Sequence, residues 1–576
     1  MKTKILSISI IITLFVSGCN FLDYDDSTHY TKETAFETFE RHQAFLTNIY
    51  SYLPVRYGTI DDALRSAASD EAVFVDRSSA VHNFYNGAWS AVNTVDDGWQ
   101  FFSGIRQANM FLAEAAGQEF DDLKTHPDYN NIMQQYRLYP YEARFLRAYF
   151  YFELARRYGA VPLITTVLTE EQANSVSRIS FDQIIEFIVS ECDALAEVLP
   201  ASFSQITGQD LGRATKGAAM ALKSRALLYA ASPLHNPDND PEKWRRAAKA
   251  AGEMISIAQL GLNAGGLNLQ IPTLANLTNT WNRNYAQNTE LILGVLRPNS
   301  RDFEQLNYPI GIVGGGSTGH APTQNLVDAY EMTSGLPARP NSGYEEQCPN
   351  FNPANPYAGR DPRLQNAIAR NNEVWPTVYG QPLEIWYGGK SGKPAAFASP
   401  TGYYMKKYVV GTYELRPGYT LGQGTRTWVL MRYSEVLLNY AEAVIEGYGD
   451  FELTNEDLPI TAREAVRRVR ARGGVAMPAF PESLTPEQFK LKLRNERMVE
   501  LAFEDHRFWD IRRWKIGPET TEIRGVDIVK TGDDPATFTY TPIVVENRIF
   551  TDNMYFYPIP QRERLLNPNL TQNNGW

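Results

Sequence analysis

Apolar residues recur at helical spacing through the first 260 residues of the chain. The pattern predicts helices over Thr31–Tyr52, Ile105–Ala116, Ala143–Tyr158, Phe181–Leu199, Thr215–Ala231 and Pro241–Gln259. Thr31 or Thr34 is suited to cap the first of these helices, and Pro54 ends it. The third helix is apolar on nearly every face, so we expect it to be buried on both sides up to Gly159. The fold is therefore predicted to be mainly α-helical.

The helical pattern stops over residues 261–427, where Gly, Pro and Asn become frequent. Only short strand candidates remain, chiefly Glu290–Leu296 and Tyr404–Val410. A long irregular region inside a compact protein usually carries function or is disordered, and its many Trp and Tyr residues argue against disorder. We expect this insert to face a ligand.

Helical spacing returns over residues 428–515. Met431–Glu446 predicts an amphipathic helix, and Leu493–Trp514 combines a helix of mixed charge with large aromatic residues. The last segment, 516–576, is Pro-rich and is predicted to be mostly extended and to wrap the helical body.

Three glutamates in the Leu493–Trp514 stretch stand four residues apart, at positions 496, 500 and 504. Like charges at this spacing repel one another on a helix, so arginines from elsewhere should lie between them. Within the stretch, Arg497 can meet Glu500 across one turn, and Glu504 can meet Arg507. Such a charged and aromatic helix is expected to be covered by other parts of the chain.

The N-terminus has the pattern of an export signal. Lys2 and Lys4 precede an apolar run, Ile5–Val16, which is too short to span a bilayer. The run ends in Val-Ser-Gly-Cys19, the pattern of a bacterial lipoprotein signal, although an ordinary signal peptide with a chance cysteine is the alternative. Residues 1–18 are thus predicted to be a signal peptide, with Cys19 lipidated. Residues 19–32 form an extended acidic tether, and 33–576 form one body.

Composition narrows the function classes. The 576 residues are 43% hydrophobic, which allows a large core, and carry a net charge of −11 with basic residues dispersed among acids. A nucleic-acid partner would need a basic face, so none is expected. Cys192 and Cys348 are interpreted as free thiols, although a disulfide between them remains open.

No catalytic motif is convincing. Gly314–Gly319 matches dinucleotide and nucleophile-elbow patterns only by composition, because Pro322 follows and no strand–turn–helix context is visible. The seven histidines form no metal-ligand pair, and adjacent acids such as Asp70–Glu71 provide no glycosidase geometry. No enzyme activity and no cofactor are predicted, while a structural calcium site stays open.

Recognition chemistry is the remaining signal. Sugar rings stack on aromatic faces and accept hydrogen bonds from flanking polar groups. Two regions offer this combination, residues 76–89 and the insert. The candidate ligand-binding residues are Arg77, Asn83, Tyr85, Trp89, Trp281, Tyr308, Trp375 and Trp386.

Several stretches together resemble a known family. They are ERMVELAFEDHRFWDIRRW (496–514), WVLMRYSEVLLNYAEA (428–443), AVRRVRARGG (465–474), EARFLRAYFYFELARRYGAVPLI (142–164) and YFYPIPQRERLLNPNLTQNNGW (555–576). They are similar to the SusD/RagB family of nutrient-binding outer-membrane lipoproteins. The resemblance implies tetratricopeptide-like helical hairpins in a right-handed superhelical body, with the loop-rich insert and its short strands attached. No 34-residue repeat is visible in the sequence itself.

The same resemblance implies a function without catalysis. The protein would be lipid-anchored in the outer membrane facing the cell exterior, bind an oligosaccharide, and deliver it to a SusC-like TonB-dependent transporter. Alternatives are the same scaffold binding peptides, a surface glycan hydrolase, or a transporter subunit without a ligand of its own. The sequence does not identify the glycan, its linkage or the transporter.

Overall fold

The computed structural model describes residues 32–96, 98–115, 117–207, 212–282, 288–339, 347–419 and 425–576. The predicted signal peptide, Cys19 and most of the acidic tether lie outside these residues. Within the described ranges, no helix combines the length and the apolar character that crossing a bilayer requires.

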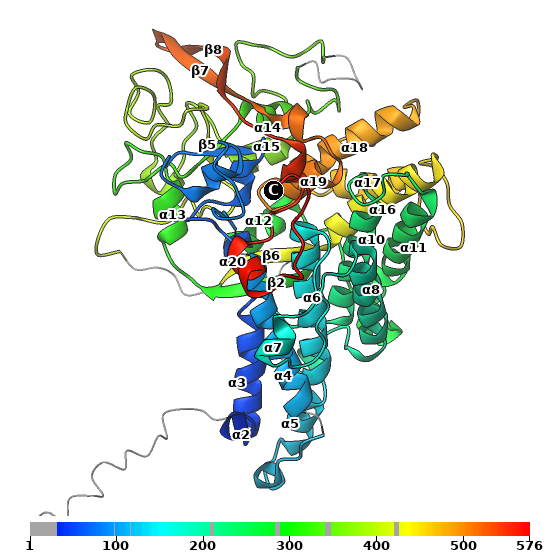
Figure 1. Cartoon of the computed structure of the whole chain (residues 1–576). Coiled ribbons are helices and arrows are strands. Elements are labelled where there is room, and N and C mark those ends of the chain that lie inside the picture. The colour runs from blue at the N-terminus through cyan, green and yellow to red at the C-terminus, as the bar shows by residue number, and fades with distance from the viewer. Residues whose placement is uncertain are drawn as a thin grey trace, which may run out of the picture.

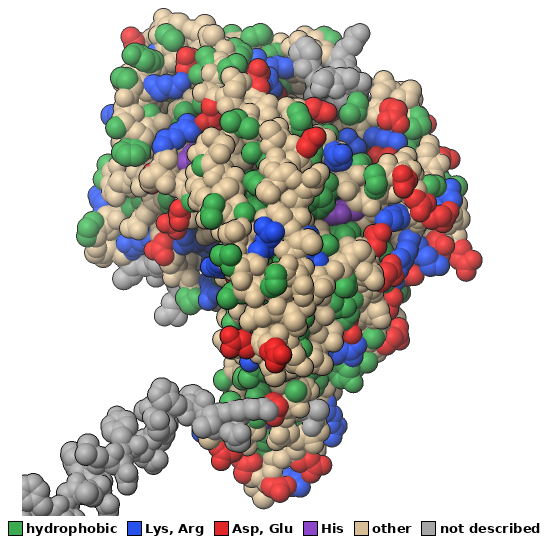
Figure 2. All heavy atoms as spheres, viewed as in Figure 1, with side chains coloured by type: hydrophobic (Ala, Val, Ile, Leu, Met, Phe, Trp, Pro, Cys, Tyr) green, Lys and Arg blue, Asp and Glu red, His purple; other side chains and the backbone are tan. Residues whose placement is uncertain are grey.

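Helices that pack in chain order make up the first half of the molecule (Figure 1). They are α2 (Lys32–Ala35), α3 (Phe39–Tyr50), α4 (Phe101–Glu114), α5 (Tyr129–Tyr136), α6 (Tyr139–Tyr158), α7 (Glu170–Ala173), α8 (Phe181–Val198), α9 (Ser204–Thr207), α10 (Lys216–Ala231) and α11 (Pro241–Ala258). Helix α4 packs on α6, α6 on α8, α8 on α10, and α10 on α11. On the face shown in Figure 2, acidic and basic side chains alternate over the helical side. The predicted run of helices is confirmed.

Local chemistry explains where these helices begin and end. The Ser180 hydroxyl accepts a hydrogen bond from the Gln183 backbone amide, and the Ser180 backbone amide donates to the Gln183 side-chain oxygen, which closes a capping box at the start of α8. At the start of α10 the Thr215 hydroxyl accepts a hydrogen bond from the Ala218 backbone amide. Helix α6 is buried on nearly every face, as predicted, and ends at Gly159, whose φ of 68° favours glycine.

The sequence placed some helix boundaries wrongly. The predicted helix Thr31–Tyr52 is two helices, because the Thr38 side chain accepts from the Arg41 amide and starts α3 afresh. Met431 and Arg432 belong to a strand and not to a helix, so helix α16 begins at Tyr433. The Leu493–Trp514 stretch is not one continuous helix, because Phe503 and Asp505 have positive φ and interrupt it.

The rest of the chain alternates irregular backbone with short elements. The helices are α12 (Leu274–Asn282), α13 (Asp302–Asn307), α14 (Gln324–Ala329), α15 (Pro362–Ala367), α16 (Tyr433–Tyr448), α17 (Ala462–Arg470), α18 (Pro486–Glu500), α19 (Arg507–Arg513) and α20 (Gln561–Leu566). The strands are β1 (Ala72–Phe74), β2 (Leu291–Pro298), β3 (His320–Pro322), β4 (Ile368–Ala369), β5 (Tyr404–Met405), β6 (Thr425–Arg432), β7 (Glu522–Asp533) and β8 (Ala536–Asn547).

Four two-stranded antiparallel sheets are formed by these strands: β1–β3, β2–β6, β4–β5 and β7–β8. Pairing of β2 with β6 joins an early segment of the insert to the segment at its end. Strand β5 is only two residues long, shorter than the predicted Tyr404–Val410. The tail does not simply wrap the body, because β7 and β8 form a long hairpin that projects from the irregular side (Figure 1).

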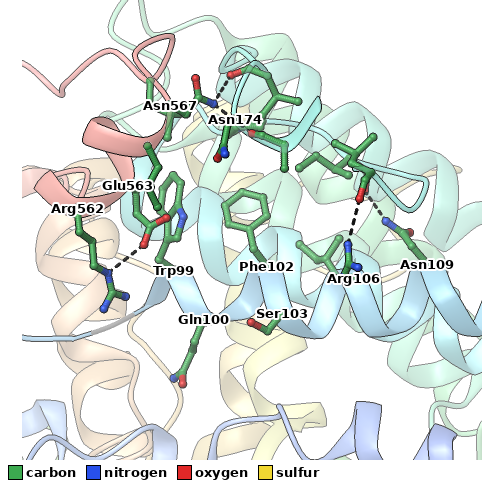
Figure 3. A pocket seen from close by; sticks show the side chains of 18 of the residues that line it. Trp99, Gln100, Phe102, Ser103, Arg106, Asn109, Asn174, Arg562, Glu563 and Asn567 are labelled. Carbon is green, nitrogen blue, oxygen red and sulfur yellow. Dashed lines mark hydrogen bonds and ion pairs between the residues drawn. The ribbon is translucent and has the colours of Figure 1, made fainter. Parts of the chain in front are cut away.

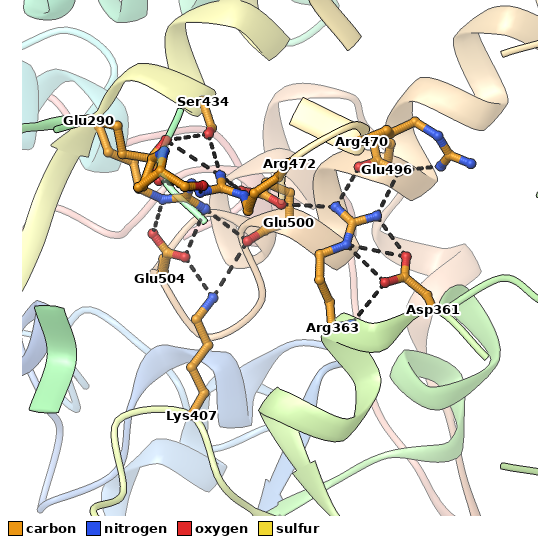
Figure 4. Close-up of polar contacts among 12 residues, drawn as sticks. Glu290, Asp361, Arg363, Lys407, Ser434, Arg470, Arg472, Glu496, Glu500 and Glu504 are labelled. Carbon is orange, nitrogen blue, oxygen red and sulfur yellow. Dashed lines mark hydrogen bonds and ion pairs between the residues drawn. The ribbon is translucent and has the colours of Figure 1, made fainter. Parts of the chain in front are cut away.

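A buried ion cluster ties the insert to the C-terminal helices (Figure 4). It joins six carboxylates and six cations: Glu290, Glu331, Asp361, Glu496, Glu500 and Glu504 with Arg363, Lys407, Arg432, Arg470, Arg472 and Lys492. At its centre, Glu500 lies 2.7 Å from Arg472, 2.8 Å from Arg432 and 2.9 Å from Arg363. The predicted need for distant arginines between the glutamates is confirmed.

The predicted ion pairs Arg497–Glu500 and Glu504–Arg507 are wrong. Arg497 pairs with Asp510, and Arg507 pairs with Asp70, both at 2.8 Å. The break between α18 and α19 turns the arginines away from their neighbours in sequence, so each finds a partner elsewhere.

The cluster controls protonation at its centre. Burial alone would raise the pKa of Glu500, but Arg472, Arg432 and Arg363 outweigh it and hold the pKa well below its ordinary 4.5. The pKa of Glu504 is lowered in the same way, against the effect of burial, by Arg432 and Lys407. Both carboxylates are therefore ionised at neutral pH inside the protein.

We expect Glu500→Gln to destabilise the fold by about 3–5 kcal/mol, because three buried guanidinium groups lose their shared carboxylate. Chemical and thermal unfolding measure the change. The matched control is Glu186→Gln, which removes an exposed ion pair with Arg246 and should cost no more than about 0.5 kcal/mol. Equal losses in the two variants would contradict a stabilising role for the cluster.

Acid should remove this stabilisation. Because the folded pKa of Glu500 lies below 4.5, its ion pairs contribute fully above about pH 4.5 and fade as pH falls through the folded value. The difference in unfolding free energy between wild type and Glu500→Gln is thus expected to shrink between neutral and strongly acidic pH. A difference that stays constant, or grows, on acidification would show that Glu500 is not held ionised.

Candidate functional site

The β7–β8 hairpin links the two regions that the sequence singled out for ligand binding. Its middle contacts the insert through Tyr387, whose amide donates to the Ile528 carbonyl at 2.8 Å. Its base contacts the first region through Arg77, which pairs with Glu546 at 2.7 Å. Ile528 faces Tyr540 in the register, so the two contacts are six residues apart, or about 20 Å along the strand.

At the middle of the hairpin lies what we name the hairpin surface: Trp386, Tyr387, Lys393, Lys530 and Phe538. The Tyr387 side chain is 66% exposed, and Trp386 is half-buried against Phe538 with ring centroids 5.4 Å apart. The Lys530 ammonium lies 5.2 Å from the Trp386 ring centre. This arrangement offers aromatic rings and cationic donors on one surface.

A small cavity of about 90 Å³ adjoins the exposed tyrosine. Lys393 and Asp527 line it and form an ion pair of 2.6 Å. The Asp527 side chain remains 49% exposed, so its carboxylate can accept hydrogen bonds from solvent or from a ligand hydroxyl group. Ring faces beside hydrogen-bonding groups suit the apolar face and polar rim of a sugar.

At the base of the hairpin, Tyr85 is buried and already engaged. Its hydroxyl lies 2.6 Å from His82 Nδ1, and the Arg548 guanidinium lies 4.0 Å from its ring centre. Burial raises the pKa of Tyr85 and lowers that of His82. The pKa of Glu546 is lowered despite burial, because Arg548 and Arg77 favour its charged form. The Arg77 side chain is about half exposed, whereas its partner Glu546 is largely buried.

Trp89, Tyr308 and Trp375 lie in the protein interior. Trp89 is 5% exposed and packs between Tyr557 and Trp576, with ring centroids 4.9 Å away in each case. The Tyr308 hydroxyl donates to the backbone carbonyl of Val410. Other protein groups cover the faces of these rings, so a ligand could not stack on them.

Trp375 packs on the edge of Tyr308 and lines a cavity of about 210 Å³ together with Lys406 and Lys407. Asn83 is half-buried and accepts a hydrogen bond from Asn86. Trp281 belongs to α12, but its side chain is outside the described residues.

Sequence reasoning missed the hairpin and, with it, Lys393, Lys530 and Phe538. A signal was available, because Asp533-Asp534-Pro535 separates two runs that alternate apolar or β-branched residues with polar ones. The Pro-rich character of the tail concealed that alternation.

The motifs set aside in the sequence have structural roles. Gly314 and Gly315 have positive φ in an irregular loop that leads into β3, with no helix directly after it. Asp70 is occupied by its ion pair with Arg507. Cys192 and Cys348 are buried free thiols, and no cluster of potential metal ligands occurs in the described part of the chain.

Comparisons with known proteins agree with this architecture. The SusD family profile matches residues 279–576, and a second profile, described as starch-binding associating with outer membrane, matches 20–228. A curated relative, SusD-like protein P2 from Formosa agariphila, is 23% identical over 590 residues, which cover 100% of this chain and 99% of the relative.

Solved structures show the same fold. A SusD-like protein from Bacteroides fragilis superposes with a TM-score of 0.75 at 29% identity, covering 94% of this chain and 98% of its own. A SusD-like carbohydrate-binding protein from the same organism gives 0.70 at 25% identity, covering 94% and 100%. The helical hairpins are thus the tetratricopeptide-like body of these proteins. With one family profile covering more than half of its length, the chain belongs to the SusD family, a non-catalytic family of carbohydrate-binding proteins associated with the outer membrane.

Proposed function

We propose that this protein captures an oligosaccharide on the hairpin surface and delivers it to a SusC-like TonB-dependent transporter. The observation that carries the proposal is the exposed Tyr387 ring beside the half-buried Trp386, with Lys393, Asp527 and Lys530 around them. These groups match the stacking and hydrogen bonding that a sugar requires. The solved relative described as carbohydrate-binding supports the ligand class.

The insert would hold the binding groups in place, so that little ordering is needed when the ligand arrives. The Val526 amide donates to the Thr401 carbonyl and the Tyr387 amide to Ile528, which fastens the hairpin to the insert. The ion cluster fastens the insert to the helices through Arg363 and Lys407. Preorganisation of this kind favours affinity because fewer side chains lose freedom on binding.

Anchoring and delivery complete the proposal. Lipidation at Cys19 would tether the protein to the outer membrane, where the second family profile places proteins of its group. The tether would leave the folded body at the cell exterior beside the transporter. Mass spectrometry of the membrane-extracted protein would detect the acylated cysteine, and Cys19→Ala should release the protein from membranes.

We expect Tyr387→Ala combined with Trp386→Ala to lower the affinity for the bound oligosaccharide about tenfold or more, since two stacking rings are lost. Isothermal titration calorimetry against glycan and peptide panels measures this. The control is Tyr419→Ala, which removes a similarly exposed tyrosine that contacts Arg416. Heat with peptides alone, or full glycan affinity in the double variant, would overturn the assignment.

A further inference from the structure

A cavity of about 450 Å³ shares no lining residue with the cavity beside the hairpin surface. Three separate segments form it: the start of α4 with Trp99 and Phe102, the stretch 162–176, and α20 with the residues after it. Figure 3 shows Trp99 and Phe102 on one side and Asn174 pointing toward them from the other. We name it the α4–α20 pocket.

The walls of the pocket are fixed by hydrogen bonds. Asn109, which is buried, donates to the carbonyls of Ile164 and Thr166, both at 3.1 Å. Asn567 donates to the Val176 carbonyl at 2.8 Å and so joins the end of α20 to the opposite wall. A cavity of this size with bonded walls is preformed for a small ligand.

The lining groups are those that recognise sugars. The Trp99 and Phe102 rings are partly exposed, with centroids 4.9 Å apart. Among the described residues, neither the Trp99 indole nor the Asn174 side chain has a hydrogen-bond partner. Two adjacent rings with an indole N–H and an amide free to bond fit a sugar ring better than an apolar ligand.

The charge of the pocket indicates which class of ligand it would bind. Its charged lining residues are Arg106, Arg562 and Glu563, which leaves one positive charge in excess. Glu563 pairs with Arg562 at 2.9 Å. Arg106 is exposed, donates only to the Leu168 carbonyl at 3.2 Å, and has no carboxylate partner in the described part of the chain. In a chain with net charge −11, such an arginine beside two aromatic rings attracts an anion.

We propose that the α4–α20 pocket is a second carbohydrate site that takes an acidic sugar, with Trp99 and Phe102 against the ring and Arg106 on the carboxylate. This second proposal is independent of the proposed function of the hairpin surface, because the two sites share no residue.

The test is calorimetry of the full chain with tri-galacturonate and with a neutral galactan trisaccharide. The wild type should bind the acidic sugar, more weakly as ionic strength rises. Arg106→Gln should reduce the affinity for tri-galacturonate about tenfold and leave the affinity for the neutral trisaccharide unchanged. Arg106→Lys should retain part of the affinity for tri-galacturonate. Trp99→Ala should abolish binding here, and Asn174→Ala, which removes no packed ring, should weaken it about threefold.

The control variant is Tyr387→Ala, which should leave binding of tri-galacturonate intact. Absence of binding by the wild type, insensitivity to both Arg106→Gln and Asn174→Ala, or loss in Tyr387→Ala would each overturn the second site. Loss in Tyr387→Ala would support the hairpin surface instead, so failure of one proposal is distinguishable from failure of the other.

Discussion

The balance of six buried carboxylates against five buried cations and the nearly buried Lys407 is the constraint on which the rest of this structure depends. Glu500 cannot be buried as an anion unless guanidinium groups surround it, because an unpaired charge in the interior is too costly. Those groups come from α15, from the end of β6 and from the turn after α17. Assembly of the cluster therefore requires the insert and the C-terminal helices to fold against one another.

Short segments of chain connect the ion cluster to the hairpin surface. Arg363 stands in α15, directly before β4, and Lys407 follows β5, so both partners of that small sheet are held by the cluster. From there the chain runs to Thr401, which hydrogen-bonds Val526 of the hairpin. Irregular backbone lacks the internal hydrogen bonds of a helix, and the cluster supplies the fixed points that it needs.

The sequence predicted the parts of this protein that depend on local spacing. Helix α8 was predicted from its apolar period, and the repulsion among Glu496, Glu500 and Glu504 required partners from elsewhere. The identity of those partners was not predictable, because Arg363 lies more than a hundred residues away and its position depends on the complete fold.

The candidate site was predicted less well than the helices. Aromatic composition pointed to Trp386, but it also pointed to Trp89, whose ring is covered by Trp576 from the end of the chain. Composition does not distinguish a ring packed under a loop from a ring exposed on it, since the distinction is made by residues distant in sequence. The sequence carries a signal for the hairpin itself, but its contacts with both candidate regions are known only from the structure.

Hydrogen–deuterium exchange on the intact protein tests the coupling between the insert and the helices most directly. If the ion cluster joins them into one cooperative unit, the bonded amides around β4 and β5 will exchange with the same opening free energy as those of α18. Exchange around β4 and β5 that is many times faster than in α18, under the same conditions, would contradict the account.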